Sequence, residues 1–148
     1  MQPAVLITGA ARRIGAALAR AFGAAGWHVV IHHGGSHDEA LALAATLPSA
    51  ECVACDLADG DAALAMIDAL AARLDDWRML VNCAAVFRPD TAEAIDPLIF
   101  AEAITVNAAT PTRMAQAFLA RARAQGGRRV VQFLDQKLRN PNPDFFSY

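Results

Sequence analysis

Two side chains near the end of the chain, a carboxylate and a phenol, are of types that can take part in proton transfer. Asp135 directly follows an apolar run, and Tyr148 comes thirteen positions later. A tyrosine hydroxyl has a pKa near ~10, so it is a sluggish proton donor at neutral pH unless its surroundings tune it. Such a pair in a loop indicates little by itself. Its meaning depends on the elements that position it.

A second group of residues, near the N-terminus, is suited to binding a phosphate. Residues 4–7 are apolar and uncharged, typical of a strand buried on both faces, and Gly9 closely follows them. A helical pattern then starts near Arg13. Its apolar side would carry Ile14, Leu18 and Phe22. The first turn of a helix offers free N–H groups and a positive dipole end, and Gly9 and Gly15 lack a Cβ that would keep a pyrophosphate away.

Strand-like runs alternate with helix-like segments along the whole chain. The expected strands are residues 4–7, 27–33, 51–55, 78–83 and 129–134. The expected helices start near residue 13 and cover about 38–47, 61–74 and 97–123. This alternation predicts an α/β fold with a parallel sheet covered by helices on both faces. In such folds ligands bind at the carboxyl ends of the strands, so chemistry is expected there.

Composition narrows the class of protein. The chain has 148 residues, 55% hydrophobic and 19% charged, and 13 basic against 15 acidic residues give a net charge of −2. These values predict one globular domain over residues 1–148 and offer no case for nucleic-acid binding. No apolar run approaches the ~20 residues of a membrane span. No secretion signal is recognised, and the odd count of three cysteines suits reduced thiols, so a cytoplasmic location is expected.

The pair Cys52 and Cys55 forms a C-x-x-C pattern, but a metal site is not expected there. Residues three apart on a strand point to opposite faces, so the two thiols should not share a ligand. No second cysteine pair exists to complete a zinc site.

The turn after residues 27–33 bears on the choice of cofactor. NAD-binding proteins usually carry an acidic residue there for the ribose hydroxyls, and none is present. A hydroxyl at Ser36 and a guanidinium at Arg13 would instead suit a 2′-phosphate. NADP is therefore favoured over NAD, although a plain glycine turn at Gly34 and Gly35 is the simpler alternative.

Two motifs carry a resemblance to a known family. TGAARRIG at residues 8–15 resembles the N-terminal turn of short-chain dehydrogenases/reductases, and its arginine variant is similar to the pteridine reductase-like branch, which uses NADPH. NCAA at residues 82–85 resembles the family motif Asn-Asn-Ala-Gly, with Cys83 and Ala85 as departures. The resemblance covers essentially the whole chain. It implies a Rossmann-type doubly wound sheet of five strands in the order 3-2-1-4-5, with the C-terminal part of the family fold missing.

The resemblance also implies roles for individual residues. The cofactor would be held by Gly9, Arg13, Ile14, Gly15, Ser36, Asp56, Leu57, Asn82 and Ala84. Phe87 would stack on the substrate, and Asn107, Asp135 and Tyr148 would serve the proton transfer. Simpler alternatives exist for four of these: a helix N-cap for Asp56, a strand-bridging amide for Asn82, a core cap for Phe87 and a solvent-facing Asn107.

The function that follows is an NADPH-dependent reductase that transfers a hydride to a C=O or C=N of a small, pteridine-like substrate. The family places a lysine four residues after the tyrosine, and this sequence stops at Tyr148. We therefore expect a truncated or partial reductase with little turnover, and a homo-oligomer only in a longer form. The alternatives are a non-catalytic NAD(P)-binding protein or inactive remnant and, third, an epimerase or dehydratase.

Overall fold

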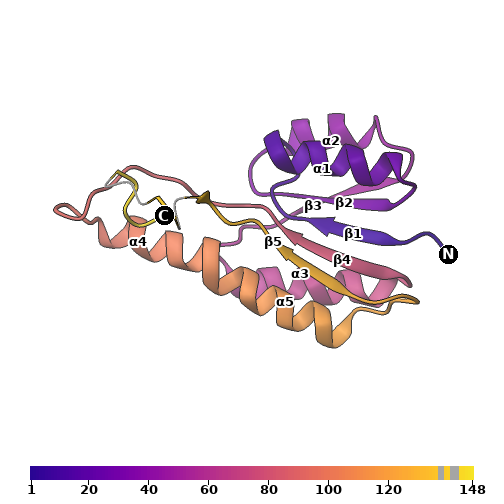
Figure 1. Ribbon diagram of the computed structural model, residues 1–148. Coiled ribbons are helices and arrows are strands. Elements are labelled where there is room, and N and C mark those ends of the chain that lie inside the picture. The colour runs from indigo at the N-terminus through magenta and orange to yellow at the C-terminus, as the bar shows by residue number, and fades with distance from the viewer. Residues whose placement is uncertain (137–138, 141–143) are drawn as a thin grey trace.

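The chain folds around a parallel sheet of five strands in the order β3-β2-β1-β4-β5. The computed structural model describes residues 1–136, 139–140 and 144–148 (Figure 1). The strands are β1 (Ala4–Ile7), β2 (His28–His33), β3 (Ala50–Ala54), β4 (Trp77–Asn82) and β5 (Arg129–Gln132). The expected Rossmann-type topology is confirmed, because all four neighbouring pairs are parallel.

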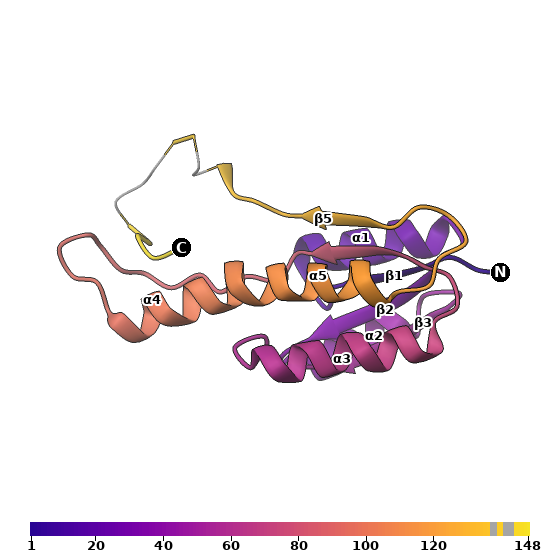
Figure 2. The same ribbon diagram turned by 90° about the horizontal axis from the view of Figure 1, so that it is seen from below.

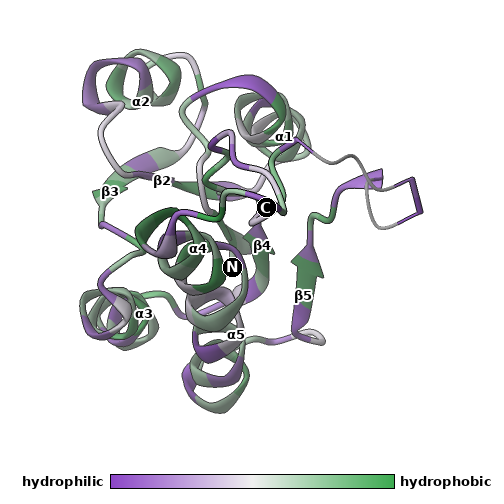
Figure 3. Cartoon of the chain, turned by 90° about the vertical axis from the view of Figure 1, so that its left-hand side faces the viewer, coloured by the Kyte–Doolittle hydropathy of each residue, from purple (hydrophilic) through white to green (hydrophobic). Residues whose placement is uncertain are grey.

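Helices cover both faces of this sheet (Figures 1 and 3). They are α1 (Arg13–Ala24), α2 (His37–Ala44), α3 (Gly60–Arg73), α4 (Pro97–Ile104) and α5 (Thr110–Arg121). One face carries α1 and α2, and the other carries α3 and α5, as the view from below also shows (Figure 2). No helix in the described part of the chain is both long and apolar enough to cross a membrane.

The helix α1 packs on the sheet through small residues rather than through the large ones that its pattern favours. Its buried positions are Gly15, Ala16, Ala19 and Gly23. Ile14, Leu18 and Phe22 share one side of the helix as expected, but that side is not packed on the core along its whole length. Ile14 is 57% exposed, whereas Leu18 and Phe22 pack against the edge of the core. Small side chains let the helix approach the strands closely, and Ile14 is left over the carboxyl end of the sheet.

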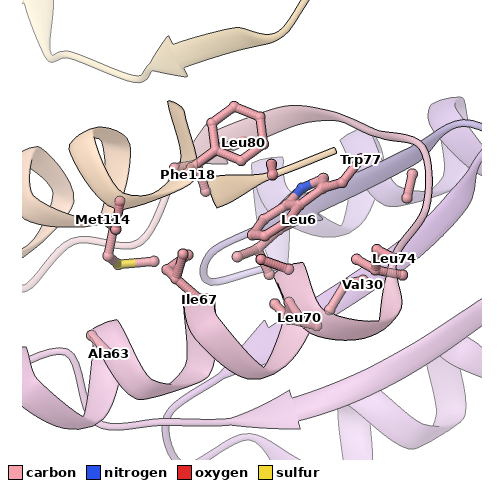
Figure 4. Close-up of a cluster of buried hydrophobic side chains, with 14 of the residues drawn as sticks. Leu6, Val30, Ala63, Ile67, Leu70, Leu74, Trp77, Leu80, Met114 and Phe118 are labelled. Atoms are coloured by element: carbon pink, nitrogen blue, oxygen red, sulfur yellow. The ribbon is translucent and has the colours of Figure 1, made fainter. Parts of the chain in front are cut away.

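The opposite face holds the larger side chains of the core (Figure 4). Trp77 and Phe118 are fully buried and pack edge to face with ring centroids 4.8 Å apart, an arrangement that aromatic pairs prefer. The aliphatic neighbours that fill the space around them include Leu6, Ile67, Leu70, Leu80 and Met114. This cluster joins α3 and α5 to the middle of the sheet.

The long helix expected over residues 97–123 is interrupted by a π-helical turn. Asp96 caps α4 by accepting hydrogen bonds from the N–H groups of Leu98 and Ile99. The turn η1 (Thr105–Ala109) then joins α4 to α5. Together α4, η1 and α5 form one continuous helical segment, and its α4 end extends past the carboxyl ends of the strands (Figure 1). Single π-helical turns of this kind are frequent at functional sites.

The last strand is shorter than expected. The sequence indicated a strand to residue 134, but β5 ends at Gln132, and the N–H of Phe133 makes a final hydrogen bond of 3.0 Å to the carbonyl of Asn82. Val131, Phe133 and Leu134 are exposed. β5 is the outer strand on this side of the sheet, so these apolar side chains lie at an exposed edge.

Two adjacent residues of α5 test the core. Replacing Phe118 with alanine should lower the free energy of unfolding by about 3–5 kcal/mol, because the aromatic ring fills a fully enclosed space. The matched control is Leu119→Ala, whose side chain is exposed and whose loss should cost no more than about 0.5 kcal/mol. Urea unfolding followed by far-UV circular dichroism measures both, and equal losses would contradict this packing.

Candidate active site

A cleft of about 560 Å³ lies at the carboxyl ends of the strands. Ten of the predicted site residues line it: Gly9, Arg13, Ile14, Gly15, Asp56, Leu57, Ala84, Phe87, Asp135 and Tyr148. Ser36, Asn82 and Asn107 do not line it. Ser36 contacts the lining residue Arg12, Asn107 contacts the lining residue Val86, and Asn82 directly precedes the lining residue Cys83. The turn near the N-terminus and the two residues near the C-terminus therefore share one cleft.

The glycines of the first turn are required by the protein's own backbone. Gly9 has φ +64°, and a Cβ there would lie 2.9 Å from the Cα of Ala84. A Cβ on Gly15 would lie 2.3 Å from the carbonyl oxygen of Gly9. Arg13 takes φ +50°, a conformation that glycine adopts more easily, at the place where the family motif has its second glycine. The backbone of the turn thus keeps a glycine-like path despite the arginine.

The hydroxyl of Thr8 fastens the end of β1 to the chain that follows β4. Its Oγ1 accepts hydrogen bonds from the N–H groups of Cys83 and Ala84, both 3.0 Å long. Two backbone donors at the mouth of the cleft are thereby satisfied. Thr8 was not among the predicted site residues, although a threonine between a strand and its glycine turn is a signal for such a contact.

His32 joins three strand ends, and sequence reasoning did not single it out. Its Nδ1 accepts a 3.2 Å hydrogen bond from the N–H of Gly9, and its Nε2 lies 3.0 Å from the carbonyl of Cys55. The ring is therefore neutral, with the proton on Nε2. Burial lowers the pKa of His32 from 6.5 to about 4, partly opposed by the hydrogen bond to Cys55. A neutral ring is what the Gly9 contact needs, since an imidazolium has no acceptor.

The arginine that contacts Ser36 is Arg12, which was not among the predicted site residues. Arg12 Nε donates to Ser36 Oγ at 2.9 Å, and Arg12 also lies 3.5 Å from a carboxylate oxygen of Glu39. Arg13 lines the cleft, but no hydrogen bond joins it to Ser36 among the described residues. The structure thus adds Arg12 as the contact of Ser36, and cofactor binding by Arg13 stays a prediction. The left-handed backbone at Arg13 turns the two consecutive side chains in different directions.

The structure decides between the two roles that the sequence left open for Asp56, a helix N-cap or a residue of the cleft. Asp56 accepts a 2.9 Å hydrogen bond from the N–H of Ala58, and the N-cap of α3 is Asp59. Leu57 is buried against the core while still bordering the cleft. Asp56 is therefore not the helix cap, and its carboxylate lies at the edge of the cleft.

Asn82 bridges two strands beneath the cleft. Its Nδ2 donates to Gln132 Oε1 at 3.0 Å and lies 3.4 Å from the carbonyl of Pro111. Its buried Oδ1 has no hydrogen-bond partner within the described residues. The structural role considered for this amide is present, since it ties β4 to β5.

Asn107 holds the chain after β4 from the helical side. Its Oδ1 accepts from the N–H of Val86 at 2.8 Å, and its Nδ2 donates to the carbonyl of Val86 at 3.0 Å. The residue lies in the π-helical turn η1, which re-aims its side chain toward that chain. The solvent-facing alternative is therefore wrong. Both polar groups of the side chain are occupied by backbone.

Tyr148 lies at the end of the cleft beside two predicted partners. Its phenol donates a hydrogen bond to the side chain of Asp135, and its ring meets that of Phe87 edge to face with centroids 4.8 Å apart. Burial, the negative charge of Asp135 and that hydrogen bond all raise the pKa of Tyr148 above 10.0. Phe87 is 54% exposed, so it is not a core cap.

The cysteines offer no metal site. Cys52 packs on the core beneath α1 and α2, whereas Cys55 packs on the opposite core, as expected for their spacing. Burial raises the pKa of Cys52, Cys55 and Cys83, so all three are protonated thiols at neutral pH. Across the described ranges no group of three or more metal-binding side chains comes together.

The neutral ring of His32 makes stability depend on pH. The pKa of His32 is 6.5 in the unfolded chain and about 4 in the folded chain. The contribution of the neutral ring to the free energy of unfolding is therefore fully present above pH 6.5 and is lost as the pH falls toward 4. The full loss is about 3 kcal/mol. Urea unfolding at several pH values should show this slope in the parent chain and in His37→Gln, an exposed residue whose ring contacts His33. An equally steep slope in His32→Gln between pH 6.5 and about 5 would refute the assignment.

Asp135 should govern part of the ionisation of Tyr148. In Asp135→Asn the pKa of Tyr148 should fall while staying above 10.0, because burial, the largest cause of the rise, remains. The sequence holds a single tyrosine, so the near-ultraviolet absorbance of tyrosinate reports this residue directly. Asp38→Asn, on the exposed first turn of α2, is the control and should leave the titration unchanged. No difference between the two variants would exclude the Asp135 contact.

Comparison with known proteins agrees with this geometry. The sequence model for short chain dehydrogenases matches residues 3–148. A D-threitol dehydrogenase from Mycolicibacterium smegmatis is 31% identical over 134 residues, which are 88% of this chain and 52% of that enzyme. The chain therefore spans about half the length of this curated relative.

Solved structures give the same result. The FolM alternative dihydrofolate reductase 1 of Brucella suis, in complex with NADP, has a TM-score of 0.90 at 31% identity over 99% of this chain and 62% of its own. A short chain dehydrogenase of Burkholderia cenocepacia, also with NADP, has a TM-score of 0.89 at 29% identity, covering 99% and 61%. With a family match over nearly its whole length, this chain belongs to the short chain dehydrogenase family.

Proposed function

We propose that the cleft binds NADPH and that the chain carries the cofactor site and proton donor of an NADPH-dependent reductase. The observation that supports this most is that a single cleft of about 560 Å³ is lined by the Gly9–Gly15 turn and by Asp135 and Tyr148. Backbone suited to a phosphate and a side chain that could donate a proton thus border the same cleft. The activity of a longer protein is part of the proposal, since the chain spans 62% of the FolM structure.

The residues present fit a dinucleotide along the cleft. The pyrophosphate would lie at the start of α1, which has no side-chain cap and no acidic residue in its first turn. The N–H of Gly9 is already bonded to His32, so the donors available to a phosphate are those of α1 itself. The ribose would lie against Ala84, and the adenine would lie between Asp56 and Leu57.

The 2′-phosphate that distinguishes NADPH from NADH would be held by Arg12 and Ser36. These side chains are already in contact at the end of the cleft where Gly34 also lies. A guanidinium and a hydroxyl together favour a dianionic phosphate over a ribose hydroxyl. Glu39 lies against Arg12 in this structure, and a phosphate would compete with that carboxylate for the guanidinium.

At the other end of the cleft, the residues suit reduction of a planar substrate. NADPH supplies a hydride to the carbon of a C=O or C=N bond. The Oη–H of Tyr148 would give the matching proton to the oxygen or nitrogen, and Phe87 presents an exposed ring for stacking. The carboxylate of Asp135 would accept hydrogen bonds from ring N–H or amino groups, which favours a pteridine-like substrate over a plain ketone.

A second candidate is a protein that binds NADP(H) without turnover. The specific observation behind it is that burial and Asp135 raise the pKa of Tyr148, whereas efficient proton relay needs a lower one. Under this candidate the dinucleotide site would function as described, and Tyr148 would have no chemical role.

Cofactor selectivity tests the proposed 2′-phosphate site. Arg12→Ala should weaken NADPH binding by about 10- to 100-fold, because a charge-assisted hydrogen bond contributes about 1.5–3 kcal/mol. NADH binding should change little. Arg20→Ala, which removes the same charge from an exposed position of α1, should leave both affinities unchanged. Fluorescence titration of the parent chain and both variants measures the affinities for each nucleotide, and an equal loss for both nucleotides in Arg12→Ala would contradict the assignment.

Turnover separates the two candidates. The reductase predicts that a pterin or a quinone accelerates NADPH oxidation slowly but above background, and that Tyr148→Phe lowers this rate by about 100-fold or more through loss of the proton donor. Affinity for NADPH should be retained in the variant. Background rates in both the parent chain and Tyr148→Phe, with NADPH still bound, would favour the binding protein instead.

A further inference from the structure

We propose that Asp90 is a positioning residue that holds Tyr148 in the cleft. The role of the phenol in proton transfer rests on the proposed function, but the positioning itself does not. Asp90 lies in the chain between β4 and α4, and Ser147 directly precedes the tyrosine. Both are only 8% exposed, although aspartate is a residue that proteins seldom bury.

Asp90 makes three hydrogen bonds to the segment that carries the phenol. Its Oδ1 accepts from the N–H of Ser147 at 2.9 Å, and its Oδ2 accepts from the Ser147 hydroxyl. Its carbonyl oxygen accepts from the N–H of Phe146 at 3.1 Å. A buried carboxylate is tolerated only where donors compensate for its lost hydration, and here one serine supplies two of them. The contact joins positions 57 residues apart.

Aromatic packing fixes the same segment from a second side. The ring of Phe145 stacks on that of Phe87 with centroids 3.9 Å apart and an angle of 9° between the rings. The other contact of Phe87 is the edge-to-face packing with Tyr148. Phe145 takes φ +62°, which is unfavourable for an aromatic residue and needs support from its surroundings. The Asp90 hydrogen bonds and the Phe87 ring give that support.

The residue that holds the segment is itself well anchored. Four positions before Asp90, both backbone groups of Val86 are hydrogen-bonded to Asn107. The segment that leads to Asp90 begins at Cys83, whose N–H is hydrogen-bonded to Thr8. Asp90 is therefore connected to the core of the sheet through a short stretch of fixed backbone. Through Ser147, this stretch determines the position of Tyr148. Asp90 would therefore contribute to the proposed reaction without touching a substrate.

The ionisation of the single tyrosine reports this positioning without any substrate. In Asp90→Ala the segment should leave its site, so that Tyr148 loses its burial and its bond to Asp135, and its pKa should fall toward 10.0. Asp90→Asn should keep a pKa close to that of the parent chain, because the amide oxygen accepts from the Ser147 N–H and the amide nitrogen donates to the Ser147 hydroxyl.

Two further variants control this experiment. Glu93→Gln removes a negative charge from an exposed position of the same chain segment and should leave the titration unchanged. Ser147→Ala removes one donor and should lower the pKa of Tyr148 by less than Asp90→Ala does. If Asp90→Ala does not fold, as judged by circular dichroism, Ser147→Ala decides: a lowered pKa supports the proposal and an unchanged one overturns it.

The outcomes for positioning and for function are distinct. A folded Asp90→Ala chain in which the pKa of Tyr148 stays as high as in the parent chain overturns the role of Asp90. An equal fall in Asp90→Asn also overturns it, because charge rather than geometry would then be responsible. NADPH affinity should be unchanged in Glu93→Gln, because this exposed residue is not among those that line the cleft. Failure of the parent chain to bind NADPH would refute the proposed function and leave the tyrosine titration valid.

Discussion

The cleft depends on one stretch of irregular backbone, residues 83–90, whose polar groups are bonded by side chains from other elements. Thr8 binds its first two N–H groups, and Asn107 binds both backbone groups of Val86. At its far end Asp90 holds Ser147. Because buried backbone groups must be paired, these side chains decide the path of the stretch. That path forms one wall of the cleft and carries Phe87 and the tyrosine segment.

The turn at residues 9–15 forms another wall of the cleft, and its position is fixed by the close approach of its backbone to neighbouring backbone. Gly9 and Gly15 lie where a Cβ would collide with neighbouring backbone, so the turn fits tightly between β1 and β4. The neutral ring of His32 then joins this turn to the end of β3. The adenine, phosphate and substrate ends that we assign to the cleft are thereby parts of one rigid edge of the sheet. This explains how strands far apart in the sequence can present a single elongated site.

Sequence reasoning succeeded where the pattern was local and repeated. Apolar runs alternating with helical segments are enough to give the parallel sheet, and the family motifs are enough to give its order. It failed where tertiary contacts decided the outcome. The contact of Arg12 with Ser36 and the left-handed backbone of Arg13 were not among the expectations. Ile14 is exposed because α1 packs through small residues. His32, Thr8 and Asp90 act through partners 23 to 76 positions away, and a single sequence does not identify such distant partners.

The central claim, that this edge of the sheet holds an NADPH molecule, is tested most directly by amide hydrogen exchange with and without saturating NADPH. The account predicts slower exchange in peptides covering residues 8–16, 55–58 and 83–90. Exchange should be unaffected in peptides 74–76 and 123–128, which lie at the other end of the strands. Protection at that other end, or no protection anywhere, would contradict it.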